Sequence, residues 1–135
     1  MLTSSLLQLP LVQRTLPAGR QVGILTIARA GLSPALLAAA GVPADTPIGQ
    51  TDPAGAFNAA ILGNARLDVA AARAEHVAAA RALQADHPRL GAIVLECTNM
   101  PPYAADIACA TGLPVYSVLD AISWFQAGLR PRVHH

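Results

Sequence analysis

The residues best suited to chemistry are Glu96, Cys97, Thr98 and Asn99, which place a carboxylate, a thiol, a hydroxyl and an amide at four consecutive positions. An unbroken apolar run, residues 92–95, precedes them, and prolines follow at positions 101 and 102. Such a run, bounded by turn signals, is typical of a strand buried on both faces. Because proline suits the first turn of a helix, the segment is predicted to run from a strand through a short loop into a helix.

Cys97 is the main candidate for a catalytic residue, because it falls at the carboxyl end of this predicted strand. In open α/β sheets, ligands bind outside the carboxyl ends of the strands. The N-terminus of the following helix would also favour a thiolate, the reactive form of cysteine. The alternative is a buried structural cysteine, since free cysteine is among the most buried residue types. The strand-end position and the polar neighbours favour a site.

The composition is that of one globular domain. The chain has 135 residues, of which 53% are apolar and 13% are charged, and its formal net charge is +1. This charge gives no electrostatic footprint for nucleic acid, and the longest apolar runs are far shorter than a membrane span. Two cysteines do not suggest a disulfide framework. The first residues lack the basic region of a signal peptide, so a cytoplasmic location is expected, with neither nucleic acid nor a membrane as partner.

Hydrophobic patterning predicts strands at residues 21–28, 46–51, 92–95 and 113–119, and helices at residues 34–40, 57–62, 67–86, 102–110 and 121–129. Strands that alternate with helices imply an α/β fold, a parallel sheet with helices on both faces. Asp52 is predicted to cap the second of these helices. Charged residues of the third, Glu75 among them, are expected to form solvated edges with His76 between them. Cys109, which lies among alanine and isoleucine, is expected to pack in the core.

Serines stand at two predicted helix starts. Ser33 follows the first strand and directly precedes Pro34, a pattern that predicts a helix cap with proline at the first helical position. The free N–H groups of the same loop offer a site for a carboxylate or a phosphate, as in any β-loop-α unit. Ser4 or Ser5 is predicted to cap a helix near the N-terminus, and a plain cap is favoured there over a binding role.

Several segments together carry a resemblance to a known family. Residues 95–103, in which Thr98 follows Cys97, resemble the cysteine–threonine motif at a strand end of the aspartate/glutamate racemase superfamily. Residues 111–116 resemble the next strand of that pattern, residues 22–26 the strand that opens the second lobe, and residues 3–10 a segment near the end of the first half. The resemblance covers nearly the whole chain, and the motif at Cys97 is its most specific part.

The resemblance implies a cofactor-independent racemase or epimerase, or a related isomerase, acting at the α-carbon of an amino acid or a similar carboxylate by cysteine acid/base chemistry. Cys97 then corresponds to the catalytic cysteine of the second lobe. Thr98, with Asn99 beside it, corresponds to groups that hold the substrate carboxylate. Four more hydroxyl residues are expected to serve the same carboxylate: Thr26, Ser33, Ser4 and Ser5. No metal and no cofactor are implied.

The family builds its site from two pseudo-symmetric lobes, and each lobe supplies one cysteine. On this pattern, residues 1–20 are a remnant of the first lobe, residues 21–113 form the second lobe, and residues 114–135 return to the first lobe as a strand and a helix. The cysteine of the first lobe has no counterpart in this sequence. Racemisation would therefore need a longer form of the chain or a partner chain. A homo-oligomer is one such possibility.

Other functions are compatible with a single cysteine. A decarboxylase of the same superfamily protonates an enediolate with one cysteine, and a maleate isomerase-like enzyme would use the thiolate as a nucleophile. A non-catalytic α/β module that keeps the motif by descent is the remaining alternative. All the enzyme hypotheses take a small carboxylate as substrate.

Overall fold

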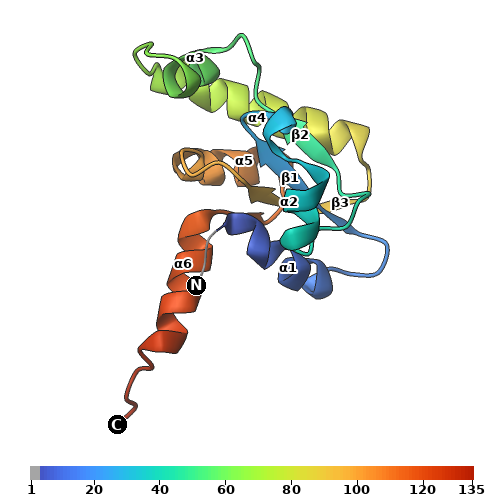
Figure 1. Cartoon of the computed structure of the whole chain (residues 1–135), viewed down its shortest axis with the longest axis vertical. Helices are drawn as coiled ribbons and strands as arrows, with labels where there is room; N and C mark the ends of the chain where they lie inside the picture. Colours follow the sequence, from blue (N-terminus) through green and yellow to red (C-terminus); the bar gives the residue numbers. More distant parts are fainter. Residues whose placement is uncertain (1–3) are drawn as a thin grey trace.

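A computed structural model describes residues 4–135 and shows an α/β fold with a four-stranded parallel sheet (Figure 1). The strands are β1 (Gln21–Thr26), β2 (Ile48–Gln50), β3 (Leu90–Leu95) and β4 (Val115–Tyr116). Their order in the sheet is β2-β1-β3-β4, and each neighbouring pair is parallel. The predicted fold class is therefore confirmed. Thr3, part of a segment that carried the family resemblance, lies outside the described residues.

The helices follow the strands along the chain as predicted, with small shifts at their ends. The α-helices of residues 4–135 are α1 (Leu9–Thr15), α2 (Pro34–Ala39), α3 (Ala56–Leu62), α4 (Val69–Asp86), α5 (Ala104–Thr111) and α6 (Val118–Leu129). Short 3-10 helices are η1 (Ser5–Gln8), η2 (Arg29–Gly31) and η3 (Pro101–Tyr103). Of the helices in this part of the chain, none has the length and apolar character needed to cross a bilayer.

Side-chain alternation along the central strands builds a core on each face of the sheet. In β3, Ala92 and Val94 pack with side chains of α1 and α2. Ile93 and Leu95 point to the opposite face and pack with α3, α4 and α5. Because successive side chains of a strand point to opposite faces, a strand covered on both sides is apolar at every position. The unbroken apolar run before Cys97 has this origin.

The last strand is much shorter than the prediction of residues 113–119, because a helix cap ends it. Ser117 is the N-cap of α6: its Oγ accepts the Leu119 N–H at 3.2 Å, and the Asp120 carboxylate accepts the Ser117 N–H at 2.7 Å. This reciprocal arrangement is a capping box, which satisfies N–H groups at the helix start. The helix therefore begins at Val118, and the apolar residues that follow Tyr116 are helical rather than extended.

Glu75 is not part of a solvated edge, as had been expected, but caps another helix. Its two carboxylate oxygens accept the N–H groups of Ala56 at 2.7 Å and Phe57 at 3.0 Å, at the start of α3. Gly55 leaves room for this contact, since a Cβ at that position would lie 2.7 Å from the carboxylate. Asp52, the predicted cap, instead accepts the Ala54 N–H at 2.9 Å within the preceding turn. The N-terminus of α3 is thus held by α4.

Two other side chains lie where the sequence did not predict them. His76, expected between solvated edges of α4, is fully buried. Cys109, expected in the core, is exposed on α5. Ile107 is the buried residue of that helix. A position two residues further on points about 200° around the helix axis, so Cys109 faces solvent.

Candidate active site

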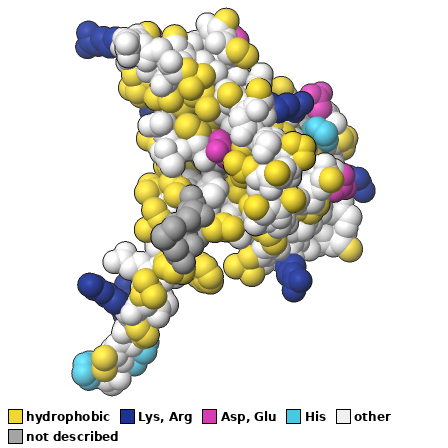
Figure 2. All heavy atoms as spheres, viewed as in Figure 1, with side chains coloured by type: hydrophobic (Ala, Val, Ile, Leu, Met, Phe, Trp, Pro, Cys, Tyr) yellow, Lys and Arg dark blue, Asp and Glu magenta, His cyan; other side chains and the backbone are white. Residues whose placement is uncertain are grey.

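The candidate site lies at the edge of the sheet where the parallel strands end. Helices α3, α5 and α6 come after β2, β3 and β4 respectively, so their N-terminal ends approach this edge. Figure 1 shows α3 and α6 at the two ends of the edge, with α5 between them. In Figure 2 the outline of the molecule is indented between α3 and α6, and hydrophobic side chains gather along the indentation. This is the position at which open α/β sheets bind ligands.

Cys97 lies at this edge, separated from the end of β3 by Glu96 alone. Its side chain is half-buried and packs against the apolar cluster between the sheet and α3, α4 and α5. The Asn99 side-chain amide donates a long hydrogen bond of 3.9 Å to the Cys97 sulfur, and the Met100 N–H donates to the Cys97 carbonyl at 3.1 Å. The deprotonated form of a cysteine, not the thiol, acts as a base, and an N–H donor such as the Asn99 amide stabilises that form.

A cavity of about 360 Å³ opens beside the loop that follows Cys97. Thr98 and Asn99 supply polar atoms to its wall. Ile61, Leu67 and Leu119 supply aliphatic surface, and the buried rings of Phe57 and Tyr103 lie beneath the wall. Among the described residues that line the cavity, none carries a charge. The thiol-bearing loop therefore borders a small, mostly apolar space with hydrogen-bonding groups on one side, which is the usual character of a small-molecule site.

Two of the predicted binding residues hold the end of β3 in place. The Thr26 hydroxyl donates to the Glu96 carboxylate at 2.8 Å, and the Ser5 hydroxyl donates to the Leu95 carbonyl at 2.8 Å. Thr26 and Ser5 are both buried. Glu96, to which the sequence assigned no role, lines a different cavity, of about 400 Å³, together with Ser4. Of the predicted residues, Ser4 lines the Glu96 cavity, and Thr98 and Asn99 line the cavity beside the loop that follows Cys97. Cys97, Thr26, Ser5 and Ser33 line neither cavity.

Ser4 and Ser33 are helix caps. The Ser4 Oγ accepts the Leu6 N–H at 3.1 Å, at the start of η1. The Ser33 Oγ accepts the Leu36 N–H at 3.2 Å, and Pro34 occupies the first position of α2. Both caps agree with the capping prediction. Of the residues proposed to bind substrate, only Thr98 and Asn99 line the same cavity beside Cys97.

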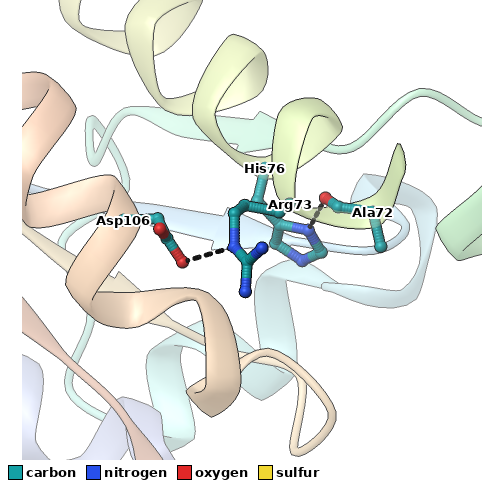
Figure 3. Close-up of polar contacts among 4 residues, drawn as sticks. All are labelled: Ala72, Arg73, His76 and Asp106. Atoms are coloured by element: carbon teal, nitrogen blue, oxygen red, sulfur yellow. Dashed lines mark hydrogen bonds and ion pairs between the residues drawn. The ribbon is translucent and has the colours of Figure 1, made fainter. Parts of the chain in front are cut away.

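His76 packs against the buried rings of Phe57 and Tyr103 beneath this cavity. Its ring stacks on Tyr103, with centroids 4.2 Å apart, and meets Phe57 edge-on at 4.3 Å. Its Nδ1 hydrogen-bonds the Ala72 carbonyl at 2.7 Å, and Nε2 has no hydrogen-bond partner in the described part of the chain (Figure 3). Burial lowers the pKa of His76 and raises the pKa of Tyr103. Within residues 4–135, no group of three or more His, Cys, Asp and Glu side chains is placed to hold a metal ion.

Figure 3 also shows how α4 and α5 are joined in front of this ring. The Arg73 Nε donates to the Asp106 carboxylate at 3.0 Å, an ion pair between partly exposed side chains. A pair of this kind contributes about 0–1 kcal/mol to stability. The Arg73 guanidinium, whose charge acts on Tyr103, is thus already paired with a carboxylate.

The buried His76 is expected to make the protein less stable in mild acid. The pKa of His76 is lowered in the folded protein, whereas in the unfolded chain it is near 6.5. Between these two values the unfolded chain binds more protons, so the stability due to neutral His76 is complete above pH 6.5 and is lost as the pH falls below it. The free energy of unfolding, measured with urea, should fall by up to about 1.4 kcal/mol per pH unit in this window.

The control for this prediction is the half-buried His87 at the end of α4. His87→Gln should keep the loss of stability below pH 6.5, and His76→Leu should remove most of it. An equal pH dependence in the two variants would contradict the assignment to His76.

The comparisons with known proteins point to one class of enzyme. The chain is 43% identical over 49 residues to a dimethylsulfoniopropionate lyase of Durusdinium sp. clade D, and 43% identical over 67 residues to dimethylsulfoniopropionate lyase 5 of Emiliania huxleyi. Both relatives are lyases by name. The aligned parts cover 36% and 50% of this chain but only 16% and 12% of the relatives, so the chain corresponds to a small part of each. No family model matches the chain, and no solved structure matches it significantly.

These relatives correct the functional interpretation of the sequence. The expected membership of the aspartate/glutamate racemase superfamily, and the racemase or isomerase activity that it implied, are wrong, because both relatives carry the name of a lyase. The alternative of a non-racemase enzyme was closer, although it named a decarboxylase. The pattern of a cysteine at a strand end beside polar groups does not specify which bond of a substrate breaks.

Proposed function

We propose that this chain belongs to a lyase and that Cys97 is the base that starts the cleavage of a small sulfonium carboxylate, 3-(dimethylsulfonio)propanoate. The observation that carries the proposal is the half-buried Cys97 thiol, approached by the Asn99 amide at 3.9 Å beside a cavity of ligand size. The substrate class comes from the names of the two partial relatives, both dimethylsulfoniopropionate lyases.

The proposed step is a redox-neutral elimination. The Cys97 thiolate takes the proton from the carbon next to the carboxylate. The electron pair of that C–H bond becomes the new C=C bond, and the bond between the β-carbon and sulfur breaks with its electron pair on sulfur. The products are acrylate and neutral dimethyl sulfide, and the Cys97 thiol then returns its proton to water. A positioned base contributes roughly 10²–10⁴-fold to such a step.

Thr98 and Asn99 are proposed to hold the substrate carboxylate. Negative charge moves onto that group as the neighbouring carbon loses its proton, so donors directed at it stabilise the transition state. Both residues are exposed and line the cavity beside the loop that follows Cys97. Thr26 and Ser5 are proposed to act indirectly, since their hydroxyls hold Glu96 and the end of β3, directly before Cys97.

The proposal is tested by product analysis. The 135-residue chain is incubated with 3-(dimethylsulfonio)propanoate. We expect dimethyl sulfide, measured by gas chromatography of the headspace, and acrylate, measured by proton NMR, to form in equal amounts and in proportion to the protein. Product formation at the rate of the protein-free control would contradict the proposal for this chain.

A further inference from the structure

Helix α6 is apolar around most of its circumference and is nevertheless exposed to solvent. It projects from the rest of the molecule in Figure 1. Its first turn packs against the body through the buried Ala121, whereas residues 122–129 are all exposed. The polar residues within the helix are Asp120, Ser123 and Gln126. Because a helix that is apolar on most sides is normally buried, another surface is expected to cover it.

The local features of α6 give it little stability of its own in water. The helix has 12 residues, and isolated helices of about this length are marginal even in alanine-rich sequences. Ile122, Trp124, Phe125 and Gly128 are weaker helix formers than alanine or leucine. The capping box at Ser117 stabilises one end of the helix. Packing of the apolar face against another surface would supply the stability that the sequence of the helix does not.

Four apolar side chains of α6 form one stripe along the helix. Val118, Ile122, Phe125 and Leu129 are separated by four, three and four positions, which is the spacing of the a and d residues of a coiled coil. At about 100° per residue, they fall within a sector of about 60°. The Ile122 and Leu129 side chains are 47% and 68% exposed. A stripe with this spacing is suited to packing along a second helix.

The stripe is complementary to itself when two copies of α6 lie antiparallel. Ile122 of one copy then lies opposite Phe125 of the other, and Val118 lies opposite Leu129. Each of the four side chains therefore meets an apolar side chain of the second copy. In a symmetric pair of this kind, one surface patch serves as both halves of the interface.

The charges of this segment favour the same arrangement. Asp120 lies in the first turn of α6, whereas Arg130 and Arg132 follow its last turn. Antiparallel pairing brings Asp120 of each copy toward the arginines of the other copy, and parallel pairing would bring like charges together. The positions that flank the stripe carry no charge, so they do not repel a second copy: Leu119, Ala121, Gln126 and Gly128.

The exposed apolar area of α6 is sufficient for a reversible dimer. The large apolar side chains that contribute to it are between 36% and 68% exposed: Leu119, Ile122, Trp124, Phe125 and Leu129. Together they present on the order of 600 Å² of surface. Two copies would then bury up to about 1,200 Å², the lower end of the range for a specific interface.

We infer that α6 is a dimerisation helix, which pairs antiparallel with α6 of a second copy of this chain through Val118, Ile122, Phe125 and Leu129. The inference is independent of the proposed lyase activity, because none of these four residues lines the cavity beside the Cys97 loop. It assigns a role to the one helix whose apolar stripe the fold leaves in solvent.

Sedimentation velocity of the 135-residue chain tests the dimer. The average mass should rise from that of one chain toward that of two over about a 100-fold range of micromolar concentrations. Ile122→Glu should remove this rise, because it places a carboxylate against the Phe125 ring of the second copy. Ser123→Glu is the matched control: it adds the same charge on the polar side of α6 and should keep the rise. A wild-type chain that stays monomeric, or equal dimerisation of the two variants, would overturn the inference.

A pair of opposite charges tests the antiparallel register. Ile122→Glu and Phe125→Lys should each give a monomer, and the double variant should dimerise again. In the antiparallel pair each glutamate lies opposite a lysine of the second copy, whereas in a parallel pair like charges would lie opposite each other. A double variant that stays monomeric would overturn the antiparallel pairing.

Other occupants of this face would give different results. A monomeric chain whose α6 amides are protected from hydrogen exchange would show that α6 folds back on its own body. A monomeric chain that co-sediments with phosphatidylserine vesicles would assign the face to a membrane surface. Either result would overturn the inference. Protection of the α6 amides that increases with the fraction of dimer would support it.

Discussion

Replacement of Cys97 by serine is expected to lower the rate of dimethyl sulfide release by at least about 100-fold, the smallest usual contribution of a positioned base. A serine hydroxyl is not ionised near neutral pH, so the variant loses the anionic base while it keeps nearly the same shape. The thiol lies two residues after the end of β3 and receives a hydrogen bond from Asn99. The measurement is the initial rate at saturating 3-(dimethylsulfonio)propanoate.

The chain contains its own control for this experiment. Cys109 is exposed on α5 and does not line the cavity beside Cys97. Cys109→Ser should therefore keep the wild-type rate, and both variants should show the same urea midpoint within experimental error. If Cys97→Ser keeps more than about a tenth of the activity, Cys97 is not the base.

Replacement of Phe57 by alanine should cost about 3–5 kcal/mol of unfolding free energy, the usual range for removing a buried phenylalanine. The Phe57 side chain is fully buried in the cluster shared by α3, α4 and α5. It contacts His76 at 4.3 Å and Tyr103 at 5.9 Å between ring centroids, so the variant also loses two edge-to-face aromatic pairs. A loss of this size is a large part of the stability of a small domain. Urea unfolding followed by circular dichroism measures it.

The matched control variant for Phe57→Ala lies on the same helix, α3. Leu62→Ala removes an apolar side chain that is 65% exposed, so its unfolding free energy should change by less than about 0.5 kcal/mol. Equal losses in Phe57→Ala and Leu62→Ala would show that the apolar cluster around Phe57 does not stabilise the fold. A Phe57→Leu variant should lie between the two, since leucine refills part of the cavity left by alanine.

Local pattern was sufficient to predict the sheet and the position of Cys97. Buried parallel strands leave continuous apolar runs in a sequence, and the run before Cys97 marks the end of β3. Ser33 with Pro34 likewise marked the start of α2, because a cap and its proline are adjacent in sequence. The length of the last strand was overestimated because apolar residues such as Val118 and Leu119 fit a strand as well as a helix. The capping box between Ser117 and Asp120 starts a helix at this point.

The features that could not be predicted depend on contacts between distant residues. The burial of His76 follows from the rings of Phe57 and Tyr103, which come from two other segments. The roles of Thr26 and Ser5 follow from their hydrogen bonds to Glu96 and Leu95, 70 and 90 residues away. No local pattern reports such partners. The exposure of Cys109 could have been predicted from the sequence, because Cys109 and Ile107 point to opposite sides of the helix axis.

The chemistry of the substrate was beyond the reach of the motif for a different reason. Several reactions of carboxylates begin when a base removes the proton from the α-carbon, and the base and the carboxylate donors are the same for all of them. The outcome depends on whether the β-carbon carries a group that can leave. The motif carries no information on this point, because the residues around the cavity beside the Cys97 loop, such as Leu67, Thr98 and Leu119, come from distant parts of the chain.

The contact between Gly55 and Glu75 has a consequence for how this protein can evolve. Any side chain at position 55 would put its first carbon 2.7 Å from the carboxylate that holds the start of α3. A side chain at position 55 therefore forces the Glu75 carboxylate to move away, and the start of α3 then loses its cap. The two positions, 20 residues apart, are thus coupled through this contact. In homologues that keep this helix pair, glycine at the first position and glutamate at the second should be gained and lost together.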